Sequence, residues 1–451
     1  MRYEPVGGAG EGEGMSGELG SRLSARMLSL VPAAALAVLG LVNAWTAGGA
    51  GVGIDYFQYW AAGQVIREGL VPNIYSGGAG PRMAEIFRER AAASGQKRYQ
   101  AAAEFRKDEI QIASTPFLYA LVNLSHSGDY ETDIRRHRAV LLACSVASIL
   151  FLCAWCGFTT EGTLLFLAFA TWALVPLQND LLDGNVNGIQ LALLTLYLFV
   201  HRRASSLWIS LAAGAVLGLA VAFKPNLAFI PVALGIYWIV NRRFGHLLAR
   251  AAGAILGVLI AIGSSSLFFG SPSFWISWAR TLRRLEQRFD VGVDLGNFGG
   301  ARLIWDWSGV NVSPLLFAGL IAVLALSLWM GRRVAEGRWR PDLVDPDERG
   351  GCDAEFLMVG VGPIIPILSS GLAWPHYLVL ALPLCIYLLR PRDRGGVYPW
   401  AVLAALLLIA SEPALRALNL GGDYAIAAGM AAGSLLLFVV ACLEAWRPEG
   451  G

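Results

Sequence analysis

The chain has 451 residues, of which 56% are hydrophobic and only 15% are charged. An average soluble domain carries about 25% charged residues, so this composition excludes an ordinary soluble enzyme and also a disordered or collagen-like chain. Basic and acidic residues number 35 and 33, and that near balance gives no indication of a nucleic-acid partner. We expect a polytopic membrane protein that uses about 20 residues for each span.

The N-terminal segment leads into a first membrane span. Residues 1–21 are rich in Gly and Glu and have no apolar period, which predicts a disordered cytoplasmic tail. Arg22 and Arg26 then precede an apolar run at 27–45. The run resembles a signal peptide, but it is long, and the sequence after it looks integral to the protein. We therefore expect an uncleaved first helix whose N-terminus lies in the cytoplasm.

Further apolar runs follow along the chain, and with the first they predict about twelve transmembrane helices. They lie at 139–157, 163–179, 186–200, 207–223, 226–240, 250–269, 313–330, 354–370, 374–390, 397–411 and 424–446. The segment at 112–124 is also apolar but is too short for a comfortable crossing. We expect a transmembrane catalytic module at 22–390, and the apolar C-terminal part, 391–451, to be scaffold helices.

The basic residues decide how the segment at 112–124 is placed. If it does not cross, most arginines of the later loops fall on the cytoplasmic side, as the positive-inside rule requires. These are Arg202, Arg203, Arg242, Arg243, Arg332, Arg333, Arg338, Arg340, Arg390, Arg392 and Arg394. The short run of Arg135, Arg136 and Arg138 then falls outside. The expected topology has both termini in the cytoplasm, an external loop at 46–138, and a half-buried external helix at 112–124.

The external loop begins with an acidic and aromatic stretch. Asp55 is followed by Tyr56, Tyr59 and other aromatic residues, and the pattern at 56–68 predicts a helix at the membrane surface. Asp55 could act chemically or could simply cap this helix. Both interpretations stay open from the residues alone.

Other external stretches are amphipathic and carry mixed charges. At 81–107 the charges alternate in sign, Arg106 among them, which is typical of a solvated helical face and could also rest on anionic headgroups. A later arginine-rich helix includes Arg280, whose side chain could pair with phosphate or simply face water. Asn297 and Arg302 flank a glycine-bearing turn close to the next span.

Polar residues also mark the external ends of several spans. Asp183 and Asn187 lie in a glycine-bearing turn, Lys224 lies in a short turn before a proline, and His376 begins a late span. Each has a structural alternative: a capped turn, a lysine that snorkels outward, or a packed histidine. Their common placement on one side of the bilayer favours a functional site, because ionisable groups near hydrocarbon are costly.

The motifs on this side resemble those of GT-C membrane glycosyltransferases. They are Asp55 with its aromatic helix, Pro116-Phe-Leu-Tyr, Asp183-Gly-Asn-Val-Asn187, Lys224-Pro225 and Trp374-Pro-His376. The resemblance covers roughly residues 27–390 and is greatest to glycosyltransferase family 87, which includes polyprenol-phosphate-mannose-dependent mannosyltransferases. The family usually has Gly-Gln-x-Asn where this chain has Gly184-Asn185-Val-Asn187, and this departure lowers the weight given to the amide at 185. The family often has a pair of polar residues around the late histidine. The second departure is that Tyr377 follows His376 in this chain.

The resemblance implies a GT-C fold and an inverting transfer of a hexose, with mannose the expected sugar. The donor would be a polyprenyl-phosphate sugar, and the acceptor a hydroxyl of a lipid or glycan at the external face of the cytoplasmic membrane. Asp55 would accept the hydroxyl proton. Lys224 and His376, helped by Arg280 and Arg302, would bind the donor phosphate. Sugar or acceptor contacts would come from Tyr56, Tyr59, Asp183, Asn187 and Asn297. A lipid-phosphate donor has no diphosphate that a metal must hold, and we expect neither a metal nor a cofactor.

Other functions remain open from the sequence. A twelve-span secondary transporter would show matched halves with broken helices at the bilayer midplane, whereas no repeat is visible here and the polar residues gather near one surface. A structural membrane subunit is a further alternative. Among enzymes, a protein O-glycosyltransferase or an aminoarabinose-type GT-C transferase is the nearest one. Consumption of a lipid-linked sugar, as against accumulation of a solute, discriminates between these classes.

Overall fold

The computed structural model describes residues 12–203, 206–288, 291–338, 350–391, 397–419 and 422–446. Across these ranges the fold is built of helices without strands, and helix accounts for 81% of it. The expected all-α class is therefore confirmed. The boundaries expected at 1–21, 22–390 and 391–451 stay predictions, and the outer two segments fall partly outside the described residues.

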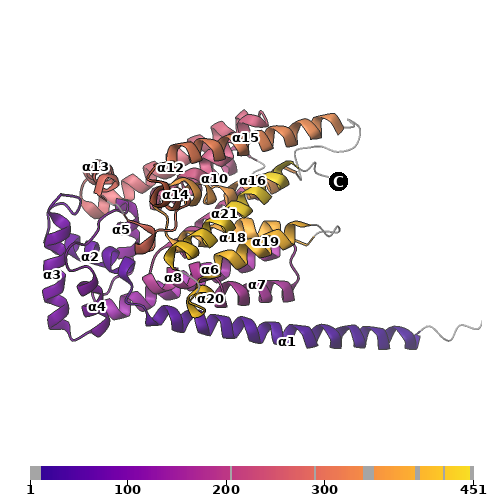
Figure 1. The fold of residues 1–451 in the computed structure, drawn as a ribbon, viewed down its shortest axis with the longest axis horizontal. Coiled ribbons are helices and arrows are strands. Elements are labelled where there is room, and N and C mark those ends of the chain that lie inside the picture. The colour runs from indigo at the N-terminus through magenta and orange to yellow at the C-terminus, as the bar shows by residue number, and fades with distance from the viewer. Residues whose placement is uncertain are drawn as a thin grey trace, which may run out of the picture.

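Five helices in the described ranges are long and apolar enough to cross a membrane. They are α1 (Gly12–Ala50, apolar from Ser29), α6 (Tyr130–Trp155), α12 (Phe244–Phe269), α15 (Ser313–Arg338) and α21 (Asp423–Trp446). A sixth span is possible because α7 (Thr160–Trp172) and α8 (Val175–Asp183) qualify together, with a bend of 56° between them. These helices are compatible with a multi-pass membrane protein, and α1 and α15 run along opposite sides of the helical bundle in Figure 1. The expected count of about twelve spans is not confirmed.

The remaining apolar segments form shorter helices. They are α9 (Asn187–Arg202), α10 (Leu207–Phe223), η2 (Pro225–Ala228), α11 (Phe229–Val240), α16 (Gly350–Val361), α17 (Ile364–Ser369), η4 (Pro375–Ala381), α18 (Leu382–Leu388), α19 (Val397–Ile409) and α20 (Glu412–Ala417). Pro363 interrupts the expected span at 354–370, between α16 and α17, because its ring replaces the backbone N–H that helix continuation needs. Pro225 lies between two expected runs and begins η2, and Pro375 begins η4 near the start of the expected span at 374–390. At about 1.5 Å per residue, the pieces are shorter than the hydrocarbon core of about 30 Å.

A cap of short helices covers one end of the long ones (Figure 1). It consists of α2 (Ile54–Glu68), α3 (Ala79–Ser94), α4 (Lys97–Phe105), α5 (Pro116–Val122) and η1 (Asn123–Ser125), with α13 (Ser273–Arg288) beside it. Its core is aromatic and includes Phe57, Trp60 and Phe87. The helix expected at 112–124 is only α5, whose residues are almost all buried. Seven residues rise about 10 Å, so this segment does not cross. After the cap come η3 (Val293–Leu295) and α14 (Gly300–Ser308).

Helices α10 and α12 cross at very short range through four glycines. Gly214 and Gly218 lie on α10, and Gly253 and Gly257 lie on α12. A Cβ at any of them would come within 2.1–2.3 Å of a backbone oxygen of the other helix. This is the small-residue packing typical of helices in membranes. Because α10 ends at Lys224, the crossing positions that residue.

Candidate active site

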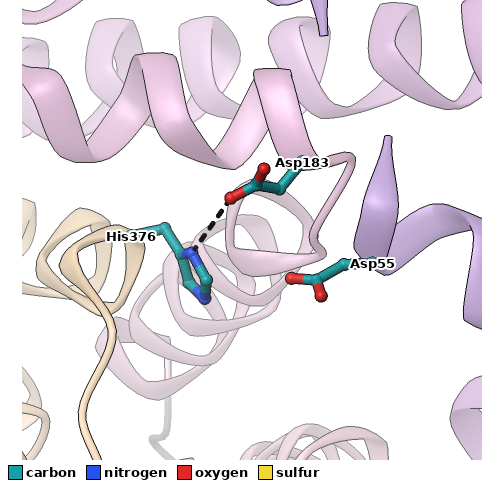
Figure 2. A group of neighbouring side chains, drawn as sticks. All are labelled: Asp55, Asp183 and His376. Carbon is teal, nitrogen blue, oxygen red and sulfur yellow. Dashed lines mark ion pairs between the residues drawn. The ribbon is translucent and has the colours of Figure 1, made fainter. Parts of the chain in front are cut away.

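Three of the ionisable residues that the sequence singled out come together in space. One side-chain ligand atom each from Asp55, Asp183 and His376 lies within 4.8 Å of the other two. Figure 2 shows the two carboxylates and the imidazole around a common space, with His376 Nδ1 4.0 Å from Asp183 Oδ2. The three residues come from the first turn of α2, the end of α8 and the start of η4. Segments far apart in the sequence therefore build one site.

Asp55 does not cap the helix on which it lies. The N-cap of α2 is Gly53, in the left-handed region at φ 78°, and no side chain caps this end. A Cβ at Gly53 would lie 2.0 Å from Ile134 Cδ1, so the close approach to α6 requires glycine. The Asp55 carboxylate instead accepts hydrogen bonds from Gln58 Nε2 at 3.2 Å and from Asn185 Nδ2 at 2.5 Å. The interpretation of Asp55 as only a helix cap is therefore wrong.

Asn185 joins the predicted residues to one another. Its Nδ2 donates to Asp55 Oδ2 and lies 3.0 Å from His376 Nε2, while its Oδ1 accepts from Lys224 Nζ at 2.7 Å. The amide is buried. It follows Gly184, whose left-handed φ of 65° ends α8 and turns the chain toward the site. Sequence reasoning gave this amide little weight, yet it is the only residue that touches all three of the others among the described contacts.

The same hydrogen bonds fix the tautomer of His376. Lys224 Nζ and the backbone N–H of Val186 both donate to Asn185 Oδ1, so the other end of the amide is its NH₂ group. An NH₂ group only donates, and His376 Nε2 must therefore accept. The ring is then neutral and carries its hydrogen on Nδ1, the atom nearest Asp183. The orientation is assigned from this network.

Lys224 points into the protein rather than snorkelling outward. It is the C-cap of α10, with an extended backbone at φ −151°, and Pro225 begins the next turn. Its ammonium donates to Asn185 and lies 4.9 Å from the centre of the Tyr377 ring. That contact is within cation–π range. The lysine therefore brings a positive charge to the carboxylates through one intervening amide.

Comparison with known families gives one match. The model of glycosyltransferase family 87 matches residues 116–345, slightly more than half of the chain. The chain belongs to glycosyltransferase family 87. It is thus a GT-C type membrane glycosyltransferase, as the sequence motifs indicated. Neither the search of curated proteins nor the search of solved structures found a match. The matched segment includes Asp183 and Lys224. Asp55 and His376 lie outside this segment, and they belong to the site because the fold brings them close to Asp183.

In this family 87 glycosyltransferase, Asp180 shapes the turn after α8. It is fully buried and accepts hydrogen bonds from Asn187 N (3.2 Å), Asn187 Nδ2 (2.8 Å) and Gly188 N (3.0 Å). It therefore satisfies N–H groups at the start of α9 that no helical carbonyl can reach. Asn187, expected to contact sugar, is itself buried and has Asp180 as its main partner. That role remains a prediction.

Two basic side chains of α6 contact backbone carbonyl groups of the same turn. His137 Nε2 lies 3.1 Å from Gly184 O and 3.0 Å from Asn185 O. Arg138 donates to Leu181 O, Leu182 O and Gly51 O at 2.8–2.9 Å. Its position outside the expected cytoplasmic clusters thus has a structural reason, because it binds carbonyls at the end of α8. No local pattern in the sequence indicated this structural role of Arg138.

The aromatic residues expected at the site are buried in the cap. Tyr56 stacks on His137 with ring centres 4.5 Å apart, and its hydroxyl lies 3.1 Å from His126 Nε2. Tyr59 is buried and packs edge-on against Tyr119. Their expected contacts with sugar or acceptor remain predictions.

The predicted residues of the 270–312 loop have other surroundings. Asn297 is buried, and its amide bonds only to backbone groups of residues 291, 299, 371 and 373. These hydrogen bonds hold the backbone of residues 371 and 373, which precede His376, in place. Arg302 pairs with Asp306 at 2.6 Å, and Arg280 is exposed on α13. The structure does not bring these residues into the Asp55 cluster, and their roles remain predictions.

The cluster has the ligand types of a cation site, but its charges are already matched. Two carboxylates and an imidazole nitrogen are ligands that divalent metals accept. However, Lys224 reaches the cluster through Asn185, and Arg106 Nη2 lies 3.7 Å from Asp55 Oδ1. Asn185 also occupies Asp55 Oδ2 and His376 Nε2. Two cationic side chains oppose a further cation, and the arrangement favours an anionic substrate.

Proposed function

We propose that this glycosyltransferase moves a hexose, with mannose the expected sugar, from a polyprenyl-phosphate donor to a hydroxyl acceptor at the external face of the cytoplasmic membrane. The observation that carries the proposal is the bridge formed by Asn185 between the Asp55 carboxylate and the Lys224 ammonium. A base for the acceptor and a cation for the donor phosphate are thereby held one amide apart.

The chemistry is a single displacement. Asp55 accepts the proton of the acceptor hydroxyl while the hydroxyl oxygen attacks the anomeric carbon of the donor sugar. The bond from that carbon to the phosphate oxygen breaks, and its electron pair leaves with the polyprenyl phosphate. One attack from the opposite side inverts the anomeric centre. The phosphate gains one negative charge as Asp55 loses one, and Lys224 stabilises the growing charge.

His376 and Asp183 support this reaction from the other side of Asn185. The neutral imidazole accepts from the amide through Nε2 and turns its Nδ1–H toward Asp183. In this state it positions Asn185. Its expected contact with donor phosphate requires that Nδ1 donate to a phosphate oxygen in place of Asp183.

An apolar groove beside Lys224 supports a lipid-linked donor. It has a volume of about 270 Å³ and lies between α10, α11 and α12. Its lining residues are Leu217, Gly218, Val221, Pro231, Ala254, Ile255, Val258 and Leu259. Val221 precedes Lys224 by three positions, less than one helical turn of about 5.4 Å. A polyprenyl chain has the chemistry to occupy such a groove while its phosphate reaches the lysine.

The test is to identify the donor. The purified full-length protein in lipid nanodiscs is given labelled polyprenyl-phosphate hexoses together with membrane-lipid acceptors. We expect one donor to be consumed with release of polyprenyl phosphate, and Asp55→Asn to abolish this. Failure to consume any lipid-linked hexose would refute the proposal. Family membership already favours transfer over secondary transport, and accumulation of a solute in proteoliposomes would reverse that preference.

A further inference from the structure

Arg106 is a largely buried cation beside the proposed base, and the chemistry above does not use it. It directly follows α4, and only 13% of its side chain is exposed. Its Nη2 lies 3.7 Å from Asp55 Oδ1. That is an ion-pair distance but is longer than a hydrogen bond. Its Nε is also buried and has no hydrogen-bond partner.

This pairing leaves the guanidinium incompletely satisfied. A guanidinium has five N–H donors in a planar fork, and a buried charge is stable only when it is both paired and hydrogen-bonded. Burial lowers the pKa of Arg106 below its ordinary value, and the charge of Asp55 opposes that effect. The side chain therefore retains donors for an anion, and phosphate matches the fork geometry.

We propose that Arg106 binds the donor phosphate and pairs with Asp55 only while the donor is absent. When the phosphodiester arrives, the guanidinium leaves the carboxylate for the phosphate oxygens. Asp55 is then free to accept the acceptor proton. This inference rests on the proposed function. It adds an order of events, because the donor must bind before Asp55 can act as the base.

The charges of the cluster are consistent with this exchange. Before binding, the carboxylates of Asp55 and Asp183 face the cations of Lys224 and Arg106. A sugar phosphodiester brings one negative charge, and transfer of the sugar leaves a phosphate monoester with two. The proton from the acceptor neutralises Asp55 in the same step. Arg106 has by then moved to the phosphate, and the neutral Asp55 no longer attracts it back while the phosphate carries its full charge.

The experiment is a double-mutant cycle on phosphate affinity. Binding of polyprenyl phosphate, which carries no sugar and cannot react, is measured for the full-length wild type, Asp55→Asn, Arg106→Met and the double variant in nanodiscs. We expect Arg106→Met to weaken binding about tenfold or more, and Asp55→Asn to strengthen it several-fold by releasing Arg106. The gain should vanish in the double variant. Arg106→Lys should restore part of the affinity, because the charge remains but the fork does not.

Two controls separate phosphate binding from structural damage. Lys107→Met removes the neighbouring cation, which is half exposed and paired with Glu104, and it should bind like the wild type. The uncharged lipid polyprenol should bind equally to all variants. If Asp55→Asn strengthens binding equally with and without Arg106, or if Arg106→Met binds like the wild type, the inference is refuted. Donor consumption by the wild type would still uphold the proposed function, whereas its absence would refute that function itself.

Discussion

Asn185 Nδ2 donates to Asp55 Oδ2 at 2.5 Å across 130 positions of sequence. The carbonyl end of the same amide accepts from Lys224. A neutral group thus stands between a carboxylate and an ammonium that would otherwise form a direct ion pair. Because the two charges are kept apart, the base and the cation both remain available to substrates.

This bridge predicts how substitutions at Asn185 behave. Asn185→Leu removes both the donor and the acceptor and should lower kcat about 100-fold, as loss of a preorganised polar contact does in other enzymes. Asn185→Gln keeps both groups on a side chain one methylene longer, and it should retain more activity than the leucine variant. Steady-state rates with the identified donor provide the measurement. Equal activity of the leucine variant and the wild type would contradict the bridging role.

Asp55→Asn tests the proposed base. We expect kcat to fall by about 10²–10⁴, the usual contribution of a general base, while the melting temperature changes little. Asp108→Asn is a suitable control, because Asp108 is an exposed carboxylate in the same loop and should keep the wild-type rate. Full transfer by Asp55→Asn would remove Asp55 from the mechanism.

Arg138 should matter for stability more than its neighbours on α6. Arg138→Met leaves three carbonyls, two of them buried, without this donor, and at about 1–3 kcal/mol for each unsatisfied buried group we expect a loss of about 3 kcal/mol or more in unfolding free energy. Arg135 is a matched comparison, with 66% of its side chain exposed and only Glu131 as its ion-pair partner. Arg135→Met should cost less than about 1 kcal/mol. Thermal unfolding in detergent distinguishes the two, and similar losses would be inconsistent with the capping role of Arg138.

His126 predicts a loss of stability in mild acid. Burial lowers its pKa from 6.5 to about 4 in the folded protein, so the unfolded chain binds the proton more readily. The group therefore costs no stability above pH 6.5, and its destabilising effect grows as the pH falls from 6.5 to about 4, by at most about 1.4 kcal/mol per pH unit. His126→Gln should flatten this part of the curve of melting temperature against pH. An unchanged slope in the variant would show that other groups cause the loss.

Removal of divalent metal should leave the transfer rate unchanged. The two cations near Asp55 and Asp183 supply the positive charge that a metal would otherwise bring. The assay is repeated after dialysis against EDTA, and again with added Mg²⁺ or Mn²⁺. Activity that is lost with EDTA and returns with metal would mean that Asp55, Asp183 and His376 bind a cation after all.

The sequence predicted the helical class and several central site residues, because both depend on local signals. Long apolar runs indicate helices, and charged residues at span ends stand out against them, as at Lys224 and His376. The span count is not confirmed, because several apolar runs, such as those at 207–223 and 397–411, form helices too short to count as spans, and Pro363 divides another run into α16 and α17. Hydropathy counts apolar residues and does not register a break in the helix.

The residues that sequence reasoning missed are those whose role depends on distant partners. Arg106 follows α4 in an alternating charge pattern that normally faces water, and only the packing of α2 beside it makes it a buried neighbour of Asp55. Asn185 and His137 likewise look like ordinary turn and helix residues. Their importance arises where the end of α8 meets α6 and η4, which no local pattern specifies.

The glycine crossing of α10 and α12 makes the region around Lys224 more rigid than the rest of the site. Since the two backbones interlock without room for a methyl group, Lys224 and the apolar groove beside it behave as one rigid body. The distance between the Lys224 ammonium and a polyprenyl chain lying in that groove is then held constant. We therefore expect movement during a catalytic cycle to occur in the cap, where α2 carries Asp55 and Arg106 directly follows α4, rather than at Lys224.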